Sequence, residues 1–237
     1  MVASGRLYLI PTPLAAGEPT ETLPGATLAA LRGLDHFVAE RAKTARAVLK
    51  AAAHPLPLAQ IHISELNEHT PATELPGLIE PLLAGRDVGL MSEAGCPGVA
   101  DPGAALVALA HDRGIPVLPL VGPSALLLAL MASGMNGQQF CFAGYLPTKP
   151  PEREAAIRSL EKTARQRHVT QLFVETPYRN EAMLDSLLKV LQPDTRLAVA
   201  VDLTGESESV ISRRVAAWRK AVVPGLKDRP AVFLIGV

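Results

Sequence analysis

The stretch "MSEAGCPGVADPG", residues 91–103, joins two segments of different periodicity. The run before it, "DVGLM" (87–91), has the continuous apolar pattern of a buried strand, and "AALVALAHDRG" (104–114) after it is typical of a helix. A strand, a loop rich in glycine and proline, and a helix in this order form one unit of an α/β sheet. Ligands of such sheets bind beyond the carboxyl ends of the strands, so we predict that residues 91–103 form a binding loop.

Single residues of this loop indicate how it would bind a ligand. Gly95 and Gly98 permit a positive φ and allow a ligand to approach the main chain. Glu93 or Asp101 could receive an ammonium group or ribose hydroxyls. For Asp101 we favour a structural role, as the N-cap of a helix that begins at Pro102, because proline is common at the first helical position.

The alternation of strand and helix patterns extends on both sides of the loop. The expected strands lie at 6–11, 36–40, 59–66, 87–91 and 115–120. The expected helices lie at 23–34, 42–53, 72–85, 104–114 and 124–134, the last of them buried. Alternation of near-continuous apolar strands with helices predicts a mostly parallel sheet that is covered on both faces.

A second unit follows a change of composition at 137–151, where aromatic, glycine and proline residues cluster as in a linker. Helix and strand patterns then alternate again. They lie at 151–166 (helix), 168–175 (strand), 180–193 (helix), 196–203 (strand), 208–220 (strand, then helix) and 230–237 (strand). The expected fold class is therefore α/β, with two α/β domains at residues 1–137 and 138–237.

Composition and charge narrow the class of protein. Of 237 residues, 48% are apolar and 4% aromatic, which indicates a globular chain and argues against a stacking platform for single-stranded nucleic acid. Residues 1–120 carry 8 Lys/Arg against 12 Asp/Glu, and residues 121–237 carry 15 against 11. Basic residues concentrate in 213–229, as either a solvated face or a phosphate-binding patch. They are Arg213, Arg214, Arg219, Lys220, Lys227 and Arg229.

Several common sites are missing from the sequence. There is no phosphate-binding G-x-x-x-x-G-K-[ST] or G-x-G-x-x-G loop, and "GPSAL" (122–126) lacks the last glycine of a nucleophile elbow. The histidines show no metal-ligand spacing, and Cys96 and Cys141 make no disulfide framework. Prolines interrupt the apolar stretch 114–135, so we expect no membrane span. With no leader at "MVASGRLYLI" (1–10), a cytoplasmic protein is expected.

The loop also resembles a known family. "LMSEAGCPGVADPG" (90–103) is similar to "VSDAGTPxxSDPG", a signature of the tetrapyrrole methylase superfamily, and in particular of its branch of ribosomal RNA 2′-O-methyltransferases that modify a small-subunit cytidine. Further resemblances follow in the same order along the chain. They are "GRLYLIPTPL" (5–14), "VAERAKTARAVLK" (38–50), "ELNEHT" (65–70), "IPVLPLVGPSALLLALMASG" (115–134), "FCFAGYLPTKPPEREAAI" (140–157), "LFVETPYR" (172–179) and "VAVDLTGESE" (199–208).

The resemblance implies two α/β domains that hold S-adenosylmethionine in the cleft between them, and a homodimer. It implies ribosomal RNA or the small ribosomal subunit as partner, with no DNA, membrane or metal. By match to the motifs, the cofactor-binding residues would be Pro11, Gly95, Cys96, Val99, Ser124, Ala125, Thr176, Leu203 and Pro230. The alternative role of Ser124 is a helix N-cap, and that of Val99 and Leu203 is core packing.

The motifs expected on the side of the methyl acceptor depart from this branch. Arg41 stands where the branch has the Asp of "AED", Ser64 where it has the His of "HExNE", and Tyr178 where it has the His of "SPHR". These departures keep two alternatives open. One is a methyltransferase for a small molecule such as a tetrapyrrole, and the other is a cofactor-binding protein without transferase activity.

Methyl transfer from a sulfonium is an in-line displacement, for which a protein positions the reacting atoms and excludes water. A ribose hydroxyl is a poor nucleophile and needs a general base. Glu40 and Glu68 are the candidates, because both lie in loops expected at the mouth of the cleft. Arg179 is a candidate for binding an anionic group of the substrate. A surface ion pair or a helix cap is the alternative for each of the three.

Overall fold

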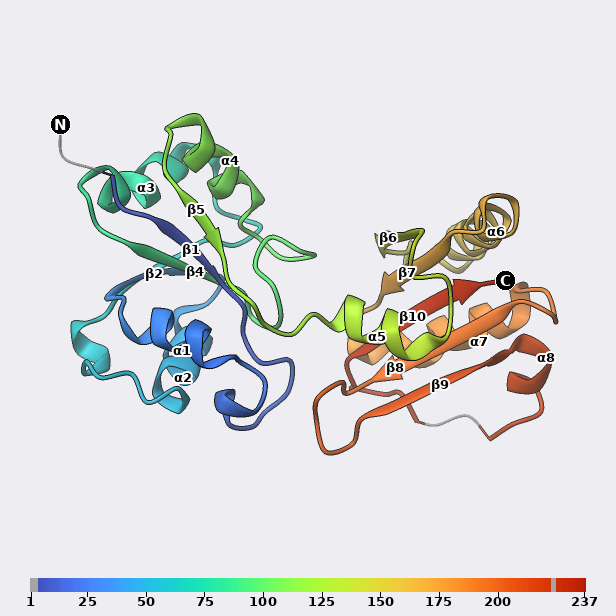
Figure 1. Ribbon diagram of the computed structural model, residues 1–237. Helices are drawn as coiled ribbons and strands as arrows, with labels where there is room; N and C mark the ends of the chain where they lie inside the picture. Colours follow the sequence, from blue (N-terminus) through green and yellow to red (C-terminus); the bar gives the residue numbers. More distant parts are fainter. Residues whose placement is uncertain (1–3, 223–224) are drawn as a thin grey trace. The chain divides into compact units, whose positions relative to one another are not determined.

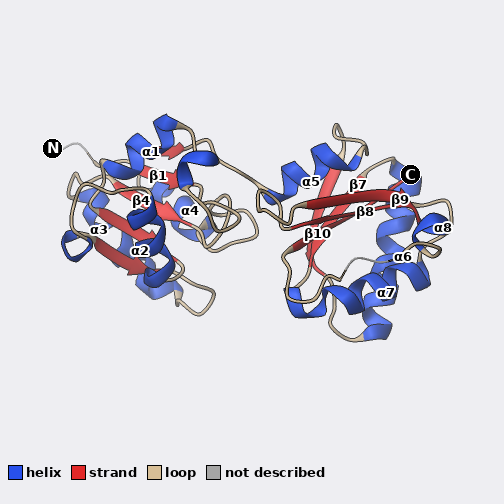
Figure 2. Ribbon diagram, turned by 90° about the horizontal axis from the view of Figure 1, so that it is seen from below, coloured by secondary structure: helices blue, strands red, loops and turns tan. Residues whose placement is uncertain are grey.

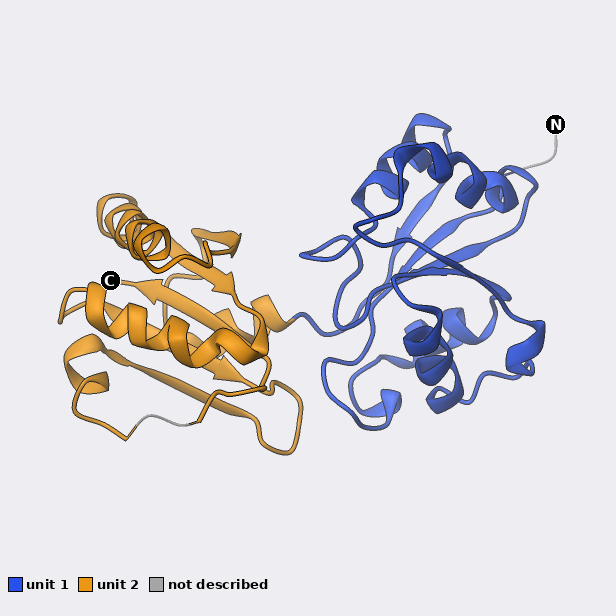
Figure 3. Ribbon diagram, turned by 180° about the vertical axis from the view of Figure 1, so that it is seen from behind, with its two compact units in different colours: residues 1–124 blue, residues 125–237 orange. Residues whose placement is uncertain are grey.

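The computed structural model describes residues 4–222 and 225–237. The chain divides into two compact units, Met1–Ser124 and Ala125–Val237, which are blue and orange in Figure 3. The sequence placed the division at 137/138 instead. Helix α5 (Ala125–Ser133) accounts for the difference, because it packs against the sheet of the second unit.

The sheet of the first unit is entirely parallel and has the order β3-β2-β4-β1-β5. Its strands are β1 (Leu7–Ile10), β2 (His36–Ala39), β3 (His62–Glu65), β4 (Val88–Met91) and β5 (Val117–Pro119). Helices α1 (Gly25–Arg32) and α2 (Ala42–Ala51) cover one face, and α3 (Leu75–Leu83) and α4 (Ala104–Asp112) cover the other (Figure 1). Three short 3-10 turns complete this unit: η1 (Pro19–Glu21), η2 (Leu58–Gln60) and η3 (Ala72–Glu74).

Alternate side chains of these strands build two separate cores. Phe37 of β2 is buried with Leu49 of α2 on one face of the sheet. Its neighbour Val38 is buried with Ile79 of α3 and Leu106 of α4 on the other face. Successive side chains of a strand point to opposite faces, so both need apolar residues when both faces are covered. This explains the continuous apolar runs of the sequence.

The sheet of the second unit has the order β6-β7-β10-β8-β9. Its strands are β6 (Phe140–Tyr145), β7 (Thr170–Val174), β8 (Arg196–Val201), β9 (Ser209–Arg214) and β10 (Ala231–Gly236). Only β6 and β7 pair in parallel; the other neighbours are antiparallel. The linker expected at 137–151 is wrong, because β6 occupies its centre. Gly144, with a φ of 69°, lies where the register of β6 shifts against β7.

Helices cover both faces of the second sheet as well. Figure 2 shows α5 on one face and α6 (Pro150–Arg167) and α7 (Asn180–Val190) on the other. Helix α5 was expected to be buried, but only one side of it is: Ala129 is inaccessible to solvent, whereas Met131 is 79% exposed. Among the residues described, no helix combines the length and the apolar character needed to cross a membrane. The predicted α/β fold class is confirmed in both units.

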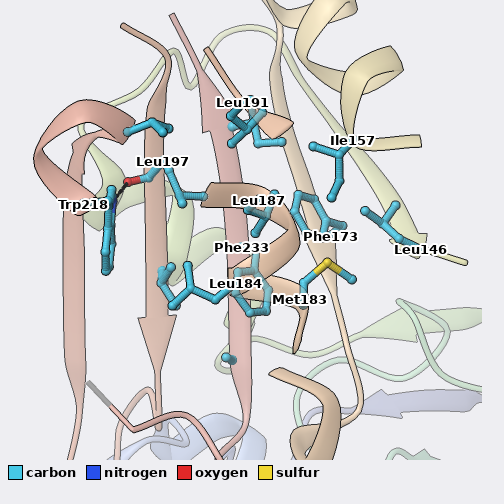
Figure 4. Packing of buried hydrophobic residues seen from close by; sticks show 14 of the residues in the cluster. Leu146, Ile157, Phe173, Met183, Leu184, Leu187, Leu191, Leu197, Trp218 and Phe233 are labelled. Carbon is cyan, nitrogen blue, oxygen red and sulfur yellow. Dashed lines mark hydrogen bonds between the residues drawn. The ribbon is translucent and has the colours of Figure 1, made fainter. Parts of the chain in front are cut away.

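The core of the second unit packs aromatic rings of two adjacent strands. Phe173 of β7 stacks on Phe233 of β10, with 5.6 Å between ring centroids. Helix α7 contributes Leu187 from above these rings (Figure 4). Trp218 ends the short helix α8 (Val215–Trp218) and donates from its indole N–H to the carbonyl of Leu197 at 2.8 Å. This hydrogen bond satisfies the one polar group of a buried indole ring.

Candidate functional site

The carboxyl ends of the parallel strands bring together the expected site residues of the first unit. Pro11 directly follows β1, and Glu40 directly follows β2. Strand β4 lies between β1 and β2 in the sheet, and the loop 92–103 follows it. Parallel strands end at the same edge, so these segments are neighbours in space. The loop therefore lies at the edge of the sheet where the sequence predicted it.

Reciprocal hydrogen bonds tie this loop to the segment that follows β1. The N–H of Thr12 donates to the carbonyl of Gly95 at 2.9 Å, and the N–H of Gly95 donates to the carbonyl of Thr12 at 3.0 Å. The hydroxyl of Ser92 also donates to the Gly95 carbonyl, at 2.7 Å. Thr12 and Ser92 are both buried. The main chain at Gly95 is thus held from two sides.

Gly95 itself has a φ of 84°, in the left-handed region that side chains other than glycine rarely adopt. A Cβ there would lie 3.2 Å from Cδ2 of Leu14 and 3.7 Å from the carbonyl oxygen of Pro123. The Sγ of Cys96 donates to that same carbonyl at 3.5 Å. Pro123 directly precedes Ser124, so the loop after β4 lies beside the segment that leads from β5 to Ser124.

Three carboxylates interact at this edge. Burial, followed by the charges of Glu40 and Glu93, raises the pKa of Asp101 to about 6. Burial, followed by the charge of Glu93, also raises the pKa of Glu40. The hydroxyl of Thr44 donates to Oε2 of Glu93 at 2.9 Å. A carboxylate with a raised pKa is a stronger base than an exposed one.

The structure does not give Asp101 the capping role that we favoured from the sequence. Helix α4 begins at Ala104, its N-cap is Gly103, and no side chain caps it. The prediction of a helix that begins at Pro102 is therefore wrong. Gly103 has a φ of 128°, and a Cβ there would lie 2.9 Å from Cδ2 of Leu90. This glycine packs closely on β4 at the position of the N-cap.

Glu68, the other candidate base, lies in the turn after β3. Its side chain is 81% exposed, and its carboxylate lies 3.5 Å from the imidazole of His69. The charge of Glu68 is the smallest of the causes that raise the pKa of Glu40. Glu40 and Glu68 thus lie at the same edge of the sheet, but only Glu40 is partly buried among other acids.

In the second unit, the remaining expected cofactor residues lie at one edge of the sheet. Strand β10 runs antiparallel to β7 and β8, so its start lies beside the ends of both. Thr176 follows β7, Leu203 follows β8 and Pro230 precedes β10. The N–H of Asp202 donates to the carbonyl of Pro230 at 3.0 Å, which joins two of these segments directly.

Solvent exposure distinguishes two of the expected cofactor residues. Val99 is 49% exposed, so packing in a core does not account for it. Leu203 is 8% exposed, which agrees with its alternative role of packing in the core. Ala125 is the first residue of α5, and Ser124 directly precedes that helix, which is the position of an N-cap.

Two ion pairs lie at the same edge of the second sheet. Arg179, the candidate for binding a substrate anion, donates from Nη2 to Oε1 of Glu175 at 2.7 Å. Arg229 donates from Nε to Oδ2 of Asp202 at 2.7 Å. Our sequence reasoning missed the roles of Glu175 and Asp202. The signal for Glu175 was its place at the end of an apolar strand, directly before the expected cofactor residue Thr176.

Most arginines of the basic segment bind the protein itself. Arg219 donates to the carbonyls of Leu188 and Leu191, both at 2.8 Å. Arg214 donates to the carbonyl of Asp194 at 2.6 Å. The guanidinium of Arg213 lies over the ring of Trp218, 5.8 Å from its centroid, and Arg229 pairs with Asp202. Five of the six basic residues are exposed, as expected for a solvated face, and the arginines also bind the protein itself.

The two edges carry groups that suit S-adenosylmethionine, a cation with amine and hydroxyl donors. Oε2 of Glu175 and Oδ1 of Asn180 are buried, and within the described part of the chain neither accepts a hydrogen bond. Buried acceptors are normally satisfied, so each suits an N–H or O–H of a ligand. Glu40 and Glu93 add negative charge at the other edge. The residues described contain no group of three or more His, Cys, Asp or Glu side chains that could hold a metal ion.

Comparison with known proteins gives a consistent result along the whole chain. The family model for tetrapyrrole (corrin/porphyrin) methylases matches residues 6–217. Proteins named "Ribosomal RNA small subunit methyltransferase I" are 36% identical in Micromonospora olivasterospora, 34% in Halalkalibacterium halodurans and 30% in Escherichia coli O157:H7. The alignments cover 90%, 93% and 92% of this chain, but only 64%, 73% and 73% of those relatives. The chain thus spans about two thirds of their length.

Two solved structures of similar fold are both methyltransferases. The methyltransferase CobJ superposes with a TM-score of 0.64 at 20% identity, covering 98% of this chain and 94% of that one. Uroporphyrin-III-C-methyltransferase from Thermus thermophilus superposes with a TM-score of 0.55 at 21% identity, covering 98% and 92%. At such identities the likeness concerns the fold. The family match over most of the sequence shows that this chain belongs to the tetrapyrrole methylase family.

Proposed function

We propose that this chain is an S-adenosylmethionine-dependent methyltransferase that methylates ribosomal RNA of the small subunit at a ribose 2′-hydroxyl. One observation carries the proposal. The residues that match the family's cofactor motifs are dispersed from Pro11 to Pro230, yet they collect at only two places, one edge of each sheet. The choice of substrate follows the relatives, which carry the ribosomal RNA name and align with nearly all of this chain.

When bound, S-adenosylmethionine supplies a methyl group on a positively charged sulfur. The chain's own task is to hold both reactants in line and to accept the hydroxyl proton. The main chain at Gly95 offers a contact surface without a side chain, and the hydrogen bonds with Thr12 keep it in place. Negative charge from Glu93 and Asp101 favours a cationic ligand near this edge.

Glu40 is the general base of this proposal. It directly follows β2, and burial, followed by the charge of Glu93, raises the pKa of its carboxyl. A ribose hydroxyl holds its proton strongly, so a carboxylate of raised basicity at the sheet edge aids its removal. Glu68 is also a carboxylate, but its side chain is exposed to solvent. Solvent weakens its electrostatic interactions, so we expect its contribution to catalysis to be small.

We also infer a cytoplasmic homodimer, as expected for a protein that meets ribosomal subunits. The alternative of a small-molecule methyltransferase is not favoured. The altered residues that suggested it, Arg41, Ser64 and Tyr178, occur in a chain that is still 34% identical to a ribosomal RNA methyltransferase over 228 residues. The alternative of a binding protein without activity predicts cofactor binding without transfer, and one assay separates it from our proposal.

The test has two stages with the full chain. Calorimetric titration with S-adenosylhomocysteine comes first, and we expect one site per chain. Transfer of a labelled methyl group to small ribosomal subunits that lack the modification follows, with fully modified subunits as the control. Glu40→Gln should lower kcat at least tenfold with little change in KM, whereas Glu68→Gln should lower it less than threefold. Binding without transfer to any ribosomal RNA would contradict the proposed substrate.

A further inference from the structure

The two ion pairs of the second sheet occupy a distinctive place in the sequence. Three of the four charged residues directly precede an expected cofactor residue: Glu175 precedes Thr176, Asp202 precedes Leu203 and Arg229 precedes Pro230. The pairs therefore lie where the main chain turns out of β7, turns out of β8 and enters β10. A charged side chain that an ion pair holds at the end of a strand also restricts the backbone of the next residue.

Glu175 binds both the main chain and the side chain of the residue that follows it. Its Oε1 accepts three hydrogen bonds: from the N–H of Thr176 at 2.7 Å, from the hydroxyl of Thr176 at 3.1 Å and from Nη2 of Arg179 at 2.7 Å. One carboxylate oxygen thus sets the direction of both the main chain and the side chain of Thr176. Hydrogen bonds to an ionised acceptor are among the stronger ones in proteins.

Stability alone does not account for this arrangement. The side chain of Glu175 is 0% exposed, and Arg179 is its single ion-pair partner. Its Oε2 and the Nε of Arg179 are both buried and accept or donate no hydrogen bond within the described residues. Removing the charge of Glu175 from water is costly, and apolar side chains of similar volume often replace a buried ion pair without loss of stability. The unsatisfied Oε2 of a carboxylate that is 0% exposed is more readily explained by a role in binding.

Asn180 directly follows Arg179 of the first ion pair and binds the main chain at Arg229 of the second. Its side chain is buried, and its Nδ2 donates to the carbonyl of Arg229 at 2.6 Å. The guanidinium of Arg229 in turn binds Asp202 and also the carbonyl of Ser207, at 2.8 Å. Asn180 thus ties the start of α7 to the segment that enters β10.

We propose that Glu175 is a positioning residue for the cofactor: its carboxylate holds Thr176 in the orientation that binds S-adenosylmethionine. This inference rests on the proposed function and names a residue through which it works. Glu175 acts through Thr176 and does not touch the reacting atoms.

The chain contains a matched control, Glu161 in α6. Its side chain is 8% exposed, and Arg165 lies four residues later, as Arg179 does after Glu175. Its Oε1 accepts from the N–H of Gln192 at 2.8 Å and from the hydroxyl of Thr195. Thr195 directly precedes β8, so this network lies at the opposite end of the strand from Leu203. Glu161 is thus a buried acid with similar partners, away from the expected cofactor edge.

The experiment compares Glu175→Ala, Glu175→Gln and Glu161→Ala by calorimetric titration with S-adenosylhomocysteine and by thermal melting. We expect Glu175→Ala to weaken binding at least tenfold and Glu161→Ala to weaken it less than twofold, although both lower the Tm. Glu175→Gln should recover most of the affinity, because its amide oxygen still accepts from Thr176 while its pairing with Arg179 is lost. If Glu175→Ala does not fold, Glu175→Asp, whose carboxylate is too short to reach Thr176, should show the same loss.

The outcomes separate this inference from the proposed function. If the unaltered chain binds S-adenosylhomocysteine and Glu175→Ala or Glu175→Asp binds it equally well, the positioning role is wrong while the function stands. Equal losses in the Glu175 and Glu161 variants would also overturn it, because they would reflect stability alone. If the unaltered chain does not bind S-adenosylhomocysteine, both proposals fall.

Discussion

The main chain at Gly95 combines a left-handed φ of 84° with two close neighbours, Leu14 and Pro123. A side chain in this conformation costs about 1–2 kcal/mol. In Gly95→Ala, the added methyl must also displace Leu14 and would cover part of the main chain that a ligand approaches. We expect the affinity for S-adenosylhomocysteine, measured by calorimetry, to fall at least tenfold.

Gly114 provides the control for that substitution. Its φ is 65°, but a Cβ there would meet no atom within 4 Å, and it lies before β5, away from the carboxyl edge. Gly114→Ala should therefore cost a similar free energy of unfolding and leave the affinity unchanged. An equal loss of affinity in both variants would show that backbone strain, and not the place of Gly95, causes the effect.

Asp101 gives the unfolding free energy a definite dependence on pH. Burial and two neighbouring acids raise the pKa of its carboxyl from 3.8 to about 6. Between pH 3.8 and about 6 the folded chain binds more protons than the unfolded chain. The stability that the protonated carboxyl of Asp101 contributes is therefore lost as the pH rises toward 6. Asp101→Asn removes the ionised group. Its Tm should exceed that of the unaltered chain above pH 6, and the difference should disappear below pH 4.

Asp87 offers the opposite case for comparison. Burial raises the pKa of its carboxyl, but hydrogen bonds from Arg6 outweigh burial and hold the pKa below its usual value. The contribution of ionised Asp87 to the free energy of unfolding is present at neutral pH and is lost on acidification. Asp87→Asn should therefore lower the Tm at pH 7. If Asp101→Asn also lowers the Tm at pH 7, the acids around Asp101 do not repel one another as described.

At the scale of residues, the sequence indicated which side chains lie at the sheet edges but not how they interact. Glu40 and Gly95 were placed correctly because each follows a strand whose apolar pattern is clear. The interaction of Glu40 with Asp101 depends on β2 and β4 being neighbours, which no local pattern reveals. The same holds for Asn180, whose partner Arg229 is distant in the sequence.

At the scale of elements, the end of helix α7 explains part of the basic segment. The last carbonyls of a helix lack partners within it, and Arg219 donates to two in this region, those of Leu188 and Leu191. We expect Arg219→Ala to lower the free energy of unfolding by about 1.5–3 kcal/mol, the range for hydrogen bonds that a charged group makes. Chemical denaturation measures this change.

The adjacent Lys220 is the control for Arg219. Lys220→Ala should leave stability nearly unchanged, because no contact of its ammonium group is found among the described residues. If Lys220 instead meets RNA, this variant reduces the salt dependence of RNA binding while Arg219→Ala does not. A loss of RNA affinity in Arg219→Ala without loss of stability would contradict the structural role of Arg219.

Elements of the second unit were harder to predict than those of the first. In the first unit, helices between buried strands imply parallel pairing, and every strand pair is parallel. In the second unit, β8 and β9 are joined without a helix and β10 enters between β7 and β8, so the sheet is largely antiparallel. The sequence of β6 resembles a linker because of its glycine and aromatic residues; the strand lies at the edge of the sheet, where Phe140 is 45% exposed.

At the scale of the whole molecule, the chain has separate cores in its two units. The expected cofactor residues are divided between these units, with Pro11, Gly95, Cys96, Val99 and Ser124 in the first and Ala125, Thr176, Leu203 and Pro230 in the second. A ligand held by residues of both units stabilises both. A ligand held by one unit stabilises only that unit directly, since binding acts on the state that contains the site.

Thermal unfolding observed by two signals distinguishes these cases. Trp218, the single tryptophan, is buried in the core of the second unit, so its fluorescence follows that unit, whereas circular dichroism follows the helices of both. Without ligand, we expect the two transitions not to coincide, because separate cores can unfold separately. S-adenosylhomocysteine at about 100 times its Kd adds about 2.7 kcal/mol to the folded state. Both signals should then shift to higher temperature and coincide. A shift of the fluorescence transition alone would place the ligand on the second unit and contradict a role for Gly95.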